Sequence, residues 1–220
     1  MRRTFWLKIG VGGLLVIGVP WLFLKTIQNT IAEPYSVDAA ALTEWTLHIP
    51  ETRAPGPALI TLVPSRRLVP QLCQQVFHRT MQSLTTPVQP GMPVVLQSEF
   101  VTSLQDVFVP AEILVIAQAA GLEDAQFEPI CMAVKREPSG GSTRQLFFVL
   151  FEASVFKDFR QELTKRYREA GGVVPFDPAA LELVLPIAAS DTNFTDWWPL
   201  AVDREVDCRA PIICAGSRFP

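Results

Sequence analysis

The sequence predicts an α+β domain that follows one N-terminal transmembrane helix. Three observations support this prediction: an uncharged apolar run near the N-terminus, strand-like apolar stretches that alternate with amphipathic helical stretches, and a composition of 49% hydrophobic and 19% charged residues. Such a composition is typical of a packed domain, and the chain of 220 residues is long enough for one domain of ordinary size. We expect a membrane anchor over 1–32, a linker with a short helix over 33–56, a globular domain over 57–202 and an irregular tail over 203–220.

The apolar run covers residues 9–24, IGVGGLLVIGVPWLFL. Together with the apolar residues before Lys8 it reaches about 20 residues, the length that a helix needs to cross a bilayer. Trp6 and Trp21 fall near the two expected membrane interfaces, where tryptophan rings concentrate, and Lys25 follows the run. The run therefore predicts a single membrane-spanning helix.

The charges around this run predict its orientation. All four charged residues among the first 32 are basic, and Arg2, Arg3 and Lys8 precede the run. By the positive-inside rule the N-terminus is cytoplasmic, which in a bacterial inner membrane places the main domain in the periplasm. The alternative is a signal peptide that is cleaved after NTIA, just before Glu33.

The remainder of the chain is acidic. Of the 19 basic and 22 acidic residues, 15 basic residues remain after the first 32 positions, so the remainder carries 15 − 22 = −7. Its Lys and Arg residues form no run longer than a pair. This pattern argues against a nucleic-acid surface, which needs clustered positive charge, and against an anionic lipid surface except at the N-terminus.

The first elements after the anchor are a short helix, a strand and a longer helix. The short helix begins near Val37, with Ser36 as its cap, and PALITLV (57–63) has the β-branched apolar character of a buried strand. The next helix covers 70–84, with Pro70 in its first turn. Its apolar positions recur at helical spacing: Leu72, Val76 and Thr80, with Cys73, Phe77 and Met81 beside them.

The following elements are a strand over 92–104, a helix from Pro110 that ends at Gly121, and a hairpin. The hairpin strands cover 127–137 and 144–152, and the paired glycines of PSGGST between them suit a tight turn. A helix capped by Ser154 follows, with an apolar face and Gly171 beyond its end. The last predicted strand is LELVLPIAA (181–189).

The four cysteines are Cys73, Cys131, Cys208 and Cys214. In an oxidising compartment an even number predicts two disulfides, and four cysteines permit three pairings. Cys208 and Cys214 lie close enough in sequence to close a small loop, which leaves Cys73 to pair with Cys131. The alternative for Cys73 and Cys131 is that both are buried thiols in the core.

Two segments carry a resemblance to a known family. FDPAALELVLPIAASDTNF (176–194) resembles the second signature segment of the two-histidine phosphoesterase (LigT-like) superfamily, in which an F-x-P lead precedes a strand that bears H-x-T. The strand ALITLV (58–63) and the helix after it resemble the first signature. The resemblance covers about residues 57–196 and implies a bilobed α/β sandwich.

In such enzymes the two histidines act as general base and general acid, and the hydroxyls bind phosphate oxygens. The resemblance aligns the first motif with Leu59-Ile60-Thr61 and the second with Val184-Leu185-Pro186, so both histidines are absent. Because Leu59 and Val184 cannot carry a proton, we predict that the chain is not an enzyme. Thr61 remains as a candidate ligand-binding residue, and Pro186 predicts a bulge or a sheet edge. The alternative is that both segments are ordinary core strands without this ancestry.

No other catalytic motif is present in the sequence. It lacks G-x-S-x-G, G-x-x-x-x-G-K-[ST], H-E-x-x-H and C-x-x-C-H. Its two histidines are His78, in a predicted helix, and His48, in a connecting region with no nucleophile nearby in sequence. We therefore expect no metal site and no cofactor.

Two functional hypotheses follow. The first is a non-catalytic accessory subunit whose periplasmic domain binds and stabilises a larger integral-membrane complex, with photosynthetic and respiratory complexes as candidates. Adjacent residues of a regular strand point to opposite faces, so Trp197 and Trp198 predict an exposed interface residue, unless both pack under the tail. The second hypothesis is a vestigial phosphoesterase-fold module that binds a phosphate-containing ligand through Thr61.

Overall fold

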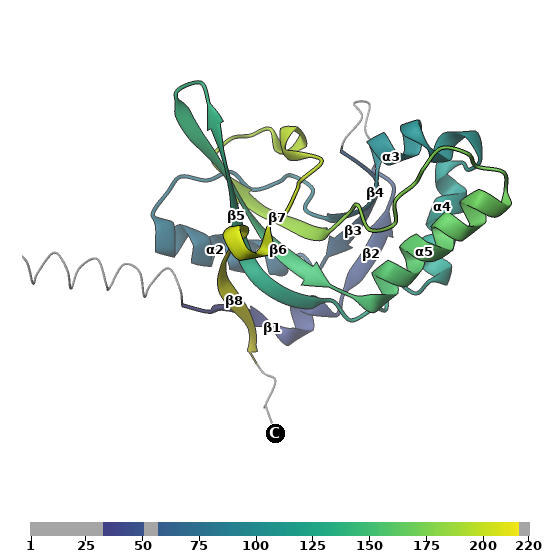
Figure 1. Ribbon diagram of the computed structural model, residues 1–220. Helices are drawn as coiled ribbons and strands as arrows, with labels where there is room; N and C mark the ends of the chain where they lie inside the picture. Colours follow the sequence, from purple (N-terminus) through teal and green to yellow (C-terminus); the bar gives the residue numbers. More distant parts are fainter. Residues whose placement is uncertain (1–32, 51–56, 216–220) are drawn as a thin grey trace, which may run out of the picture. The chain divides into compact units, whose positions relative to one another are not determined.

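The structure is a computed structural model in which residues 33–50 and 57–215 are described (Figure 1). The described residues from Pro34 onward belong to one compact unit. Within these ranges, no helix has both the length and the apolar character that a bilayer crossing requires. The predicted membrane segment lies outside the described residues, as do the residues expected to anchor it: Trp6, Lys8, Trp21 and Lys25.

The fold is α+β, as predicted, and its larger sheet has five strands in the order β1-β8-β5-β6-β7. β1 and β8 run parallel, and the other neighbouring strands are antiparallel. The strands are β1 (Tyr35–Asp38), β5 (Glu128–Ser139), β6 (Ser142–Glu152), β7 (Leu183–Ala189) and β8 (Cys208–Ala215).

The second sheet has three antiparallel strands in the order β2-β3-β4. They are β2 (Trp45–His48), β3 (Ala58–Pro64) and β4 (Met92–Leu96). β4 contacts β7, and an isolated bridge joins Thr85 to Ala189 at the end of β7. The two sheets therefore adjoin along β4 and β7.

In Figure 1, α2 lies at one side of the sheets, and α3, α4 and α5 lie together at the other side. α2 contacts β1 and β7, whereas α4 packs against α5 and the three-stranded sheet. The α-helices are α2 (Leu68–Thr80), α3 (Gln97–Thr102), α4 (Pro110–Ala119), α5 (Ser154–Glu169) and α6 (Arg204–Asp207). Short 3-10 helices are η1 (Ala39–Leu42), η2 (Leu104–Asp106) and η3 (Phe194–Trp197).

The buried apolar residues form two clusters on opposite faces of the larger sheet. Val149 and Leu185 belong to the larger cluster, whereas their strand neighbours Phe148 and Val184 belong to the smaller one. This alternation follows the two-residue period of a strand. The smaller cluster is covered by the segment after β7, which contains η3, and Trp197 belongs to that cluster.

The hairpin and the helix after it are confirmed. Gly140 and Gly141 have φ angles of +54° and +86°, and the turn that they form joins β5 to β6. α5 ends at Glu169, and Gly171 follows with φ +90°. Its N-cap is Ala153 rather than Ser154, and no side chain caps this end.

The expected short helix at Val37 is wrong. Tyr35–Asp38 form strand β1, which pairs with β8, and only the 3-10 helix η1 follows. The side chain of Asp38, rather than Ser36, caps η1 by accepting a hydrogen bond from the Ala40 N–H. The parallel partner β8 stabilises this extended conformation, and it comes from the other end of the chain.

The expected strand over 92–104 is only partly correct, because β4 ends at Leu96 and helix α3 begins at Gln97. Glu99 accepts a hydrogen bond from the Leu96 N–H at 2.8 Å and so caps the start of α3. The apolar pattern of a strand continues past Leu96, but the Glu99 carboxylate caps the chain at Leu96 and favours a helix from Gln97 onward.

The irregular tail expected from Asp203 is also wrong. Asp203 caps α6, and Cys208–Ala215 form β8, which lies between β1 and β5 in the larger sheet. Its ladder partners, Tyr35 and Met132 among them, are far away in sequence. The residue pattern within 208–215 does not reveal these distant strand partners, so it does not predict the strand.

Candidate functional site

A pocket of about 300 Å³ lies between β3 and the segment that follows β7. His48 from β2, Thr61 from β3 and Pro186 from β7 line it, together with Trp198. The structure therefore brings together the third positions of both motif triplets, Thr61 and Pro186. These residues are distant in the sequence, and the resemblance aligns each with the hydroxyl position of one H-x-T motif.

His48 and Thr61 are directly opposite one another in the β2–β3 ladder. Opposite residues in an antiparallel pair have their side chains on one face, with Cβ atoms about 4.5–5.5 Å apart. The expected position of His48 in a connecting region is wrong, because His48 is the last residue of β2 and pairs with Thr61 across the ladder. The alternation of buried Trp45 and Leu47 with exposed Thr46 and His48 is the signal that could have found it.

Gly91 allows the chain to pass close to Thr61. A Cβ atom at Gly91 would collide with the Thr61 methyl group and would stand 3.3 Å from the Leu62 carbonyl oxygen. A residue without a side chain is therefore needed here for the chain to enter β4 beside β3. The Thr61 methyl group therefore packs against Gly91, and both residues line the pocket.

Pro186 lies next to a bulge in β7, as expected for a proline within a strand. Phe148 pairs with Pro186 and Phe147 pairs with Ala188, so Ile187 is an extra residue between the two pairs. β7 is also the last strand of the five-stranded sheet. Proline cannot donate to a ladder, so a bulge at an outer strand is the position where it is tolerated.

The positions aligned with the two histidines of the resemblance lie in the core. Leu59 is 6% exposed and belongs to the larger apolar cluster, whereas Val184 is fully buried in the smaller one. Neither residue lines the pocket. The bulge in β3, with register shifts around Ile60, accounts for burial of both Leu59 and Ile60.

The two tryptophans after β7 have different environments. Trp197 is only 2% exposed, and the Arg144 guanidinium lies 4.4 Å from its ring centroid. Trp197 also donates a hydrogen bond from Nε1 to Asp191 Oδ1 at 3.4 Å. Trp198 is half-buried and lines the pocket. Trp198 is thus the tryptophan of this pair that a partner molecule could reach.

Among the described residues that line the pocket, His48 is the only one with an ionisable side chain. Among the described residues that line it there is no Lys, Arg, Asp or Glu, but there are five prolines. Hydroxyl and amide groups come from the segment after β7: Thr192, Asn193 and Thr195. Such a lining suits an uncharged, partly apolar ligand better than a phosphate, whose binding usually relies on cationic side chains.

The outer edges of both sheets are occupied by side chains. The Gln75 side-chain amide accepts from the Ser36 N–H at 2.9 Å and donates to the Ser36 carbonyl at 2.6 Å, as a neighbouring strand would. Glu123 Oε1 accepts from the Leu47 N–H of β2 at 2.8 Å. These contacts protect β1 and β2 from pairing with a strand of another chain.

The expected disulfide pairings are wrong, because Cys131 of β5 is joined to Cys208 at the start of β8. Their Cα atoms are 5.7 Å apart, a normal separation for a disulfide. Cys208 and Cys214 belong to one extended strand, which separates them by roughly 20 Å at about 3.3 Å per residue, too far for a bond. Cys73 is a half-buried thiol on α2, and burial raises the pKa of this thiol.

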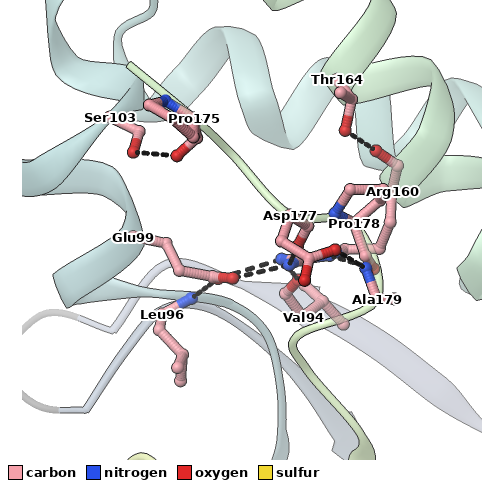
Figure 2. A network of polar contacts seen from close by, with 10 residues as sticks. All are labelled: Val94, Leu96, Glu99, Ser103, Arg160, Thr164, Pro175, Asp177, Pro178 and Ala179. Atoms are coloured by element: carbon pink, nitrogen blue, oxygen red, sulfur yellow. Dashed lines mark hydrogen bonds and ion pairs between the residues drawn. The ribbon is translucent and has the colours of Figure 1, made fainter.

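A buried charged cluster lies away from the pocket, around Arg160 of α5 (Figure 2). The Arg160 side chain is fully buried and forms a bidentate ion pair with Glu99, with Nη2–Oε1 2.6 Å and Nη1–Oε2 2.9 Å. The guanidinium also donates to the carbonyl oxygens of Val94, Asp177 and Pro178.

This cluster joins three segments of the chain. Glu99 belongs to α3, Arg160 to α5, and the carbonyl acceptors Asp177 and Pro178 precede β7. The ring of Phe176 packs on the guanidinium, with a centroid distance of 4.5 Å. Among the described residues, no buried side-chain N or O atom lacks a hydrogen-bond partner. We interpret the cluster as structural, since all of its polar groups are occupied.

The described ranges contain no group of three or more His, Cys, Asp or Glu side chains that could hold a metal ion.

Comparison with protein-family models, with curated proteins and with solved structures finds no match to this chain.

Proposed function

We propose that this protein is a non-catalytic accessory subunit. One helix over residues 5–24 spans a bacterial inner membrane, and the domain after it binds and stabilises a larger integral-membrane complex from the periplasmic side. Photosynthetic and respiratory complexes are the candidate partners. The pocket beside Trp198 is the proposed contact site for an uncharged, apolar segment of the partner.

The composition of the pocket is the observation that carries this proposal. Leu59 and Val184 are buried in apolar clusters, so the two positions at which the resemblance requires histidines offer no acid or base to a substrate. The pocket instead combines the half-buried Trp198 with prolines and neutral polar groups. Tryptophan is enriched among the residues that contribute most to protein interfaces.

Two further observations support parts of the proposal. The Cys131–Cys208 disulfide suits an oxidising compartment such as the periplasm. The Gln75 and Glu123 side chains occupy backbone groups at the edges of β1 and β2 and so disfavour addition of a partner's strand there. A partner is therefore expected to bind elsewhere, and the pocket is the proposed contact site.

The test uses the full chain with an affinity tag after Pro220, extracted from native membranes with a mild detergent. Native-size separation and mass spectrometry should find it with a stoichiometric membrane complex. Trp198→Ala should reduce this co-migration while lowering the melting temperature clearly less than Trp197→Ala does. The matched control, Val115→Ala, shortens an exposed side chain on α4 and should leave co-migration unchanged. Recovery of the wild-type chain as a lone monomer would contradict the proposal.

A second candidate function is a vestigial phosphoesterase-fold module that binds a phosphate-containing ligand. The convergence of Thr61 and Pro186 on one pocket, with His48 opposite Thr61, favours it. This proposal includes the finer fold assignment, a bilobed two-histidine-phosphoesterase-like sandwich with the pocket between its lobes. Thr61 and His48 would then bind phosphate oxygens, and no turnover is expected.

Calorimetric titration of the detergent-solubilised full chain with a cyclic nucleoside phosphodiester tests this candidate. Saturable binding that Thr61→Val abolishes would support it. Thr46→Val, the same substitution at an exposed position of β2 that does not line the pocket, is the matched control. Absence of binding, or binding that both variants leave intact, would remove this candidate. Hydrolysis of the phosphodiester that depends on Thr61 would contradict the non-catalytic assignment itself.

A further inference from the structure

The segment after β7 contains a sequence pattern that the proposed function does not use. Residues 193–195 read Asn-Phe-Thr, which is the N-x-[ST] acceptor pattern for N-linked oligosaccharides, with no proline in the middle position. The only other asparagine of the sequence is Asn29, and Ile31 stands where the pattern requires a hydroxyl. Asn193 is therefore the one asparagine of the sequence that fits this modification.

The structure places the pattern on an exposed segment outside both sheets. β7 ends at Ala189, and η3 begins at Phe194. Asn193 and Thr195 are both exposed, whereas Phe194 between them packs against the smaller apolar cluster. Acceptors of this kind lie on surface loops, because a transferase and its bulky donor must reach the amide. The structural context therefore agrees with the sequence pattern.

The two polar side chains of the pattern are not used by the fold. Asn193 is the N-cap residue of η3, where asparagine commonly accepts a backbone hydrogen bond, but its side chain makes no such bond. The Thr195 hydroxyl has no hydrogen-bond partner among the described residues. In contrast, Ser190 accepts a hydrogen bond from a backbone N–H at 2.8 Å, and Asp191 accepts one from Trp197. The domain engages these flanking side chains and leaves Asn193 and Thr195 available.

The compartment proposed for the domain is the one in which such oligosaccharides are attached. N-linked sugars occur on chains that leave the cytoplasm. The Cys131–Cys208 disulfide suits an oxidising compartment of that kind. Asp191 stands two positions before Asn193, where bacterial transferases of this class favour a carboxylate.

We propose that Asn193 is an N-glycosylation site at the mouth of the pocket beside Trp198. Asn193 Nδ2 forms a bond to C1 of the first sugar of an oligosaccharide that is carried on a polyprenyl diphosphate. The bond between C1 and the diphosphate oxygen breaks, the carrier leaves with that electron pair, and Nδ2 releases one proton. A membrane-bound oligosaccharyltransferase of the host catalyses the step. The site rests on the proposed function, because the transfer requires the domain to lie outside the cytoplasm.

A sugar on Asn193 bears directly on the proposed contact site. Asn193 is exposed and lines the pocket together with Trp198. An oligosaccharide attached there and a partner segment therefore compete for the same opening. Chains that carry the sugar are expected to be rare in the membrane complex and common in the unassembled fraction.

The test uses the full chain with the tag after Pro220, expressed in its native host and extracted with a mild detergent. The assembled and unassembled fractions are digested separately, and the peptide that contains Asn193 is analysed by mass spectrometry. We expect a series of added sugar masses on this peptide in the unassembled fraction. Fragmentation of the glycopeptide should locate the first sugar on Asn193.

Variants separate the acceptor pattern from other properties of the segment. Asn193→Gln and Thr195→Ala should each remove the sugar, whereas Thr195→Ser keeps the required hydroxyl and should retain it. The matched control is Thr192→Ala, at an exposed neighbour that also lines the pocket but lies outside the pattern. This control should leave the sugar in place, and thermal unfolding checks that each variant is folded.

An Asn193 peptide without sugar in both fractions would overturn the site, and the accessory function would stand if the chain still co-migrates with the complex. Sugar that is equally abundant in both fractions would refute the competition at the pocket. A glycosylated chain recovered only as a lone monomer would support the site and contradict the accessory function.

Discussion

Arg160 and Glu99 form a buried bidentate ion pair that joins helix α5 to helix α3. Because the arginine side chain is fully buried and the glutamate side chain 15% exposed, loss of one partner leaves the other charge poorly solvated. The same carboxylate caps the start of α3 through the Leu96 N–H. The pair thus stabilises both the position of α5 and the point at which β4 changes into a helix.

We expect Arg160→Met to lower the free energy of unfolding by about 3–5 kcal/mol, measured by urea denaturation of the full chain in detergent micelles. Arg166→Met is the matched control on the same helix, where the ion pair with Glu162 is exposed, and it should have little effect. The double variant Arg160→Met, Glu99→Gln should recover part of the loss. Equal effects of the two single substitutions would show that the buried pair is not important for stability.

Loss of the Cys131–Cys208 disulfide should also destabilise the domain. The bond closes a loop with a sequence separation of 77 residues, for which chain entropy predicts about 4 kcal/mol. We expect Cys131→Ala, Cys208→Ala to lower the melting temperature markedly under oxidising conditions. Reductant should then have no further effect on this variant. Cys73→Ala, Cys214→Ala is the comparison, and an equal or larger drop in that variant would contradict the observed pairing.

Trp197→Ala should reduce stability more than association. The indole is 2% exposed within the smaller apolar cluster, and removal of a buried tryptophan side chain costs about 3–5 kcal/mol. Trp198→Ala, at the half-buried neighbour, should cost clearly less. Thermal unfolding of both variants measures the difference, and an unchanged melting temperature for Trp197→Ala would show that the ring is not part of the core.

Gly91→Ala should destabilise the domain by about 1–3 kcal/mol, because the new methyl group overlaps the Thr61 methyl group. Thr61→Ser removes that methyl group and keeps the hydroxyl. The double variant should therefore be more stable than Gly91→Ala alone, which a double-mutant cycle of unfolding free energies measures. Additive effects of the two substitutions would contradict the close approach of Gly91 to Thr61.

Alkylation of Cys73 should require higher pH in the folded chain than in the unfolded chain. Burial disfavours the thiolate and raises the pKa of this thiol, so less thiolate is present at a given pH. Iodoacetamide labelling across a pH series, quantified by mass spectrometry of the Cys73 peptide with and without urea, gives both midpoints. Identical midpoints would show that the folded chain does not shield this thiol.

The sequence predicted correctly those elements whose residue pattern is contained within the element itself. Helix α5 has an apolar face with helical period and a glycine beyond its end, and the β5–β6 hairpin has its two glycines in the turn. The position of Pro186 predicted a bulge or an edge, and β7 has both. These features depend on backbone conformation and on neighbours within a few residues, which a local pattern contains.

The tertiary structure decided the features that depend on distant segments. β8 was predicted to be irregular because its partners, β1 and β5, come from other parts of the chain. The disulfide was mispaired for the same reason, since Cys131 and Cys208 approach one another only when β8 enters the sheet.

The candidate site shows the same division. Thr61 and Pro186 were recognised as motif positions, but His48 joined them only through the register of β2 and β3. Local sequence thus determined helix α5 and the β5–β6 turn, because those preferences arise from nearby side chains and backbone sterics, but it did not determine the extended conformation of β1 or β8. Pairing between strands and the shared lining of the pocket arise from contacts across the whole chain, and only the folded structure determines them.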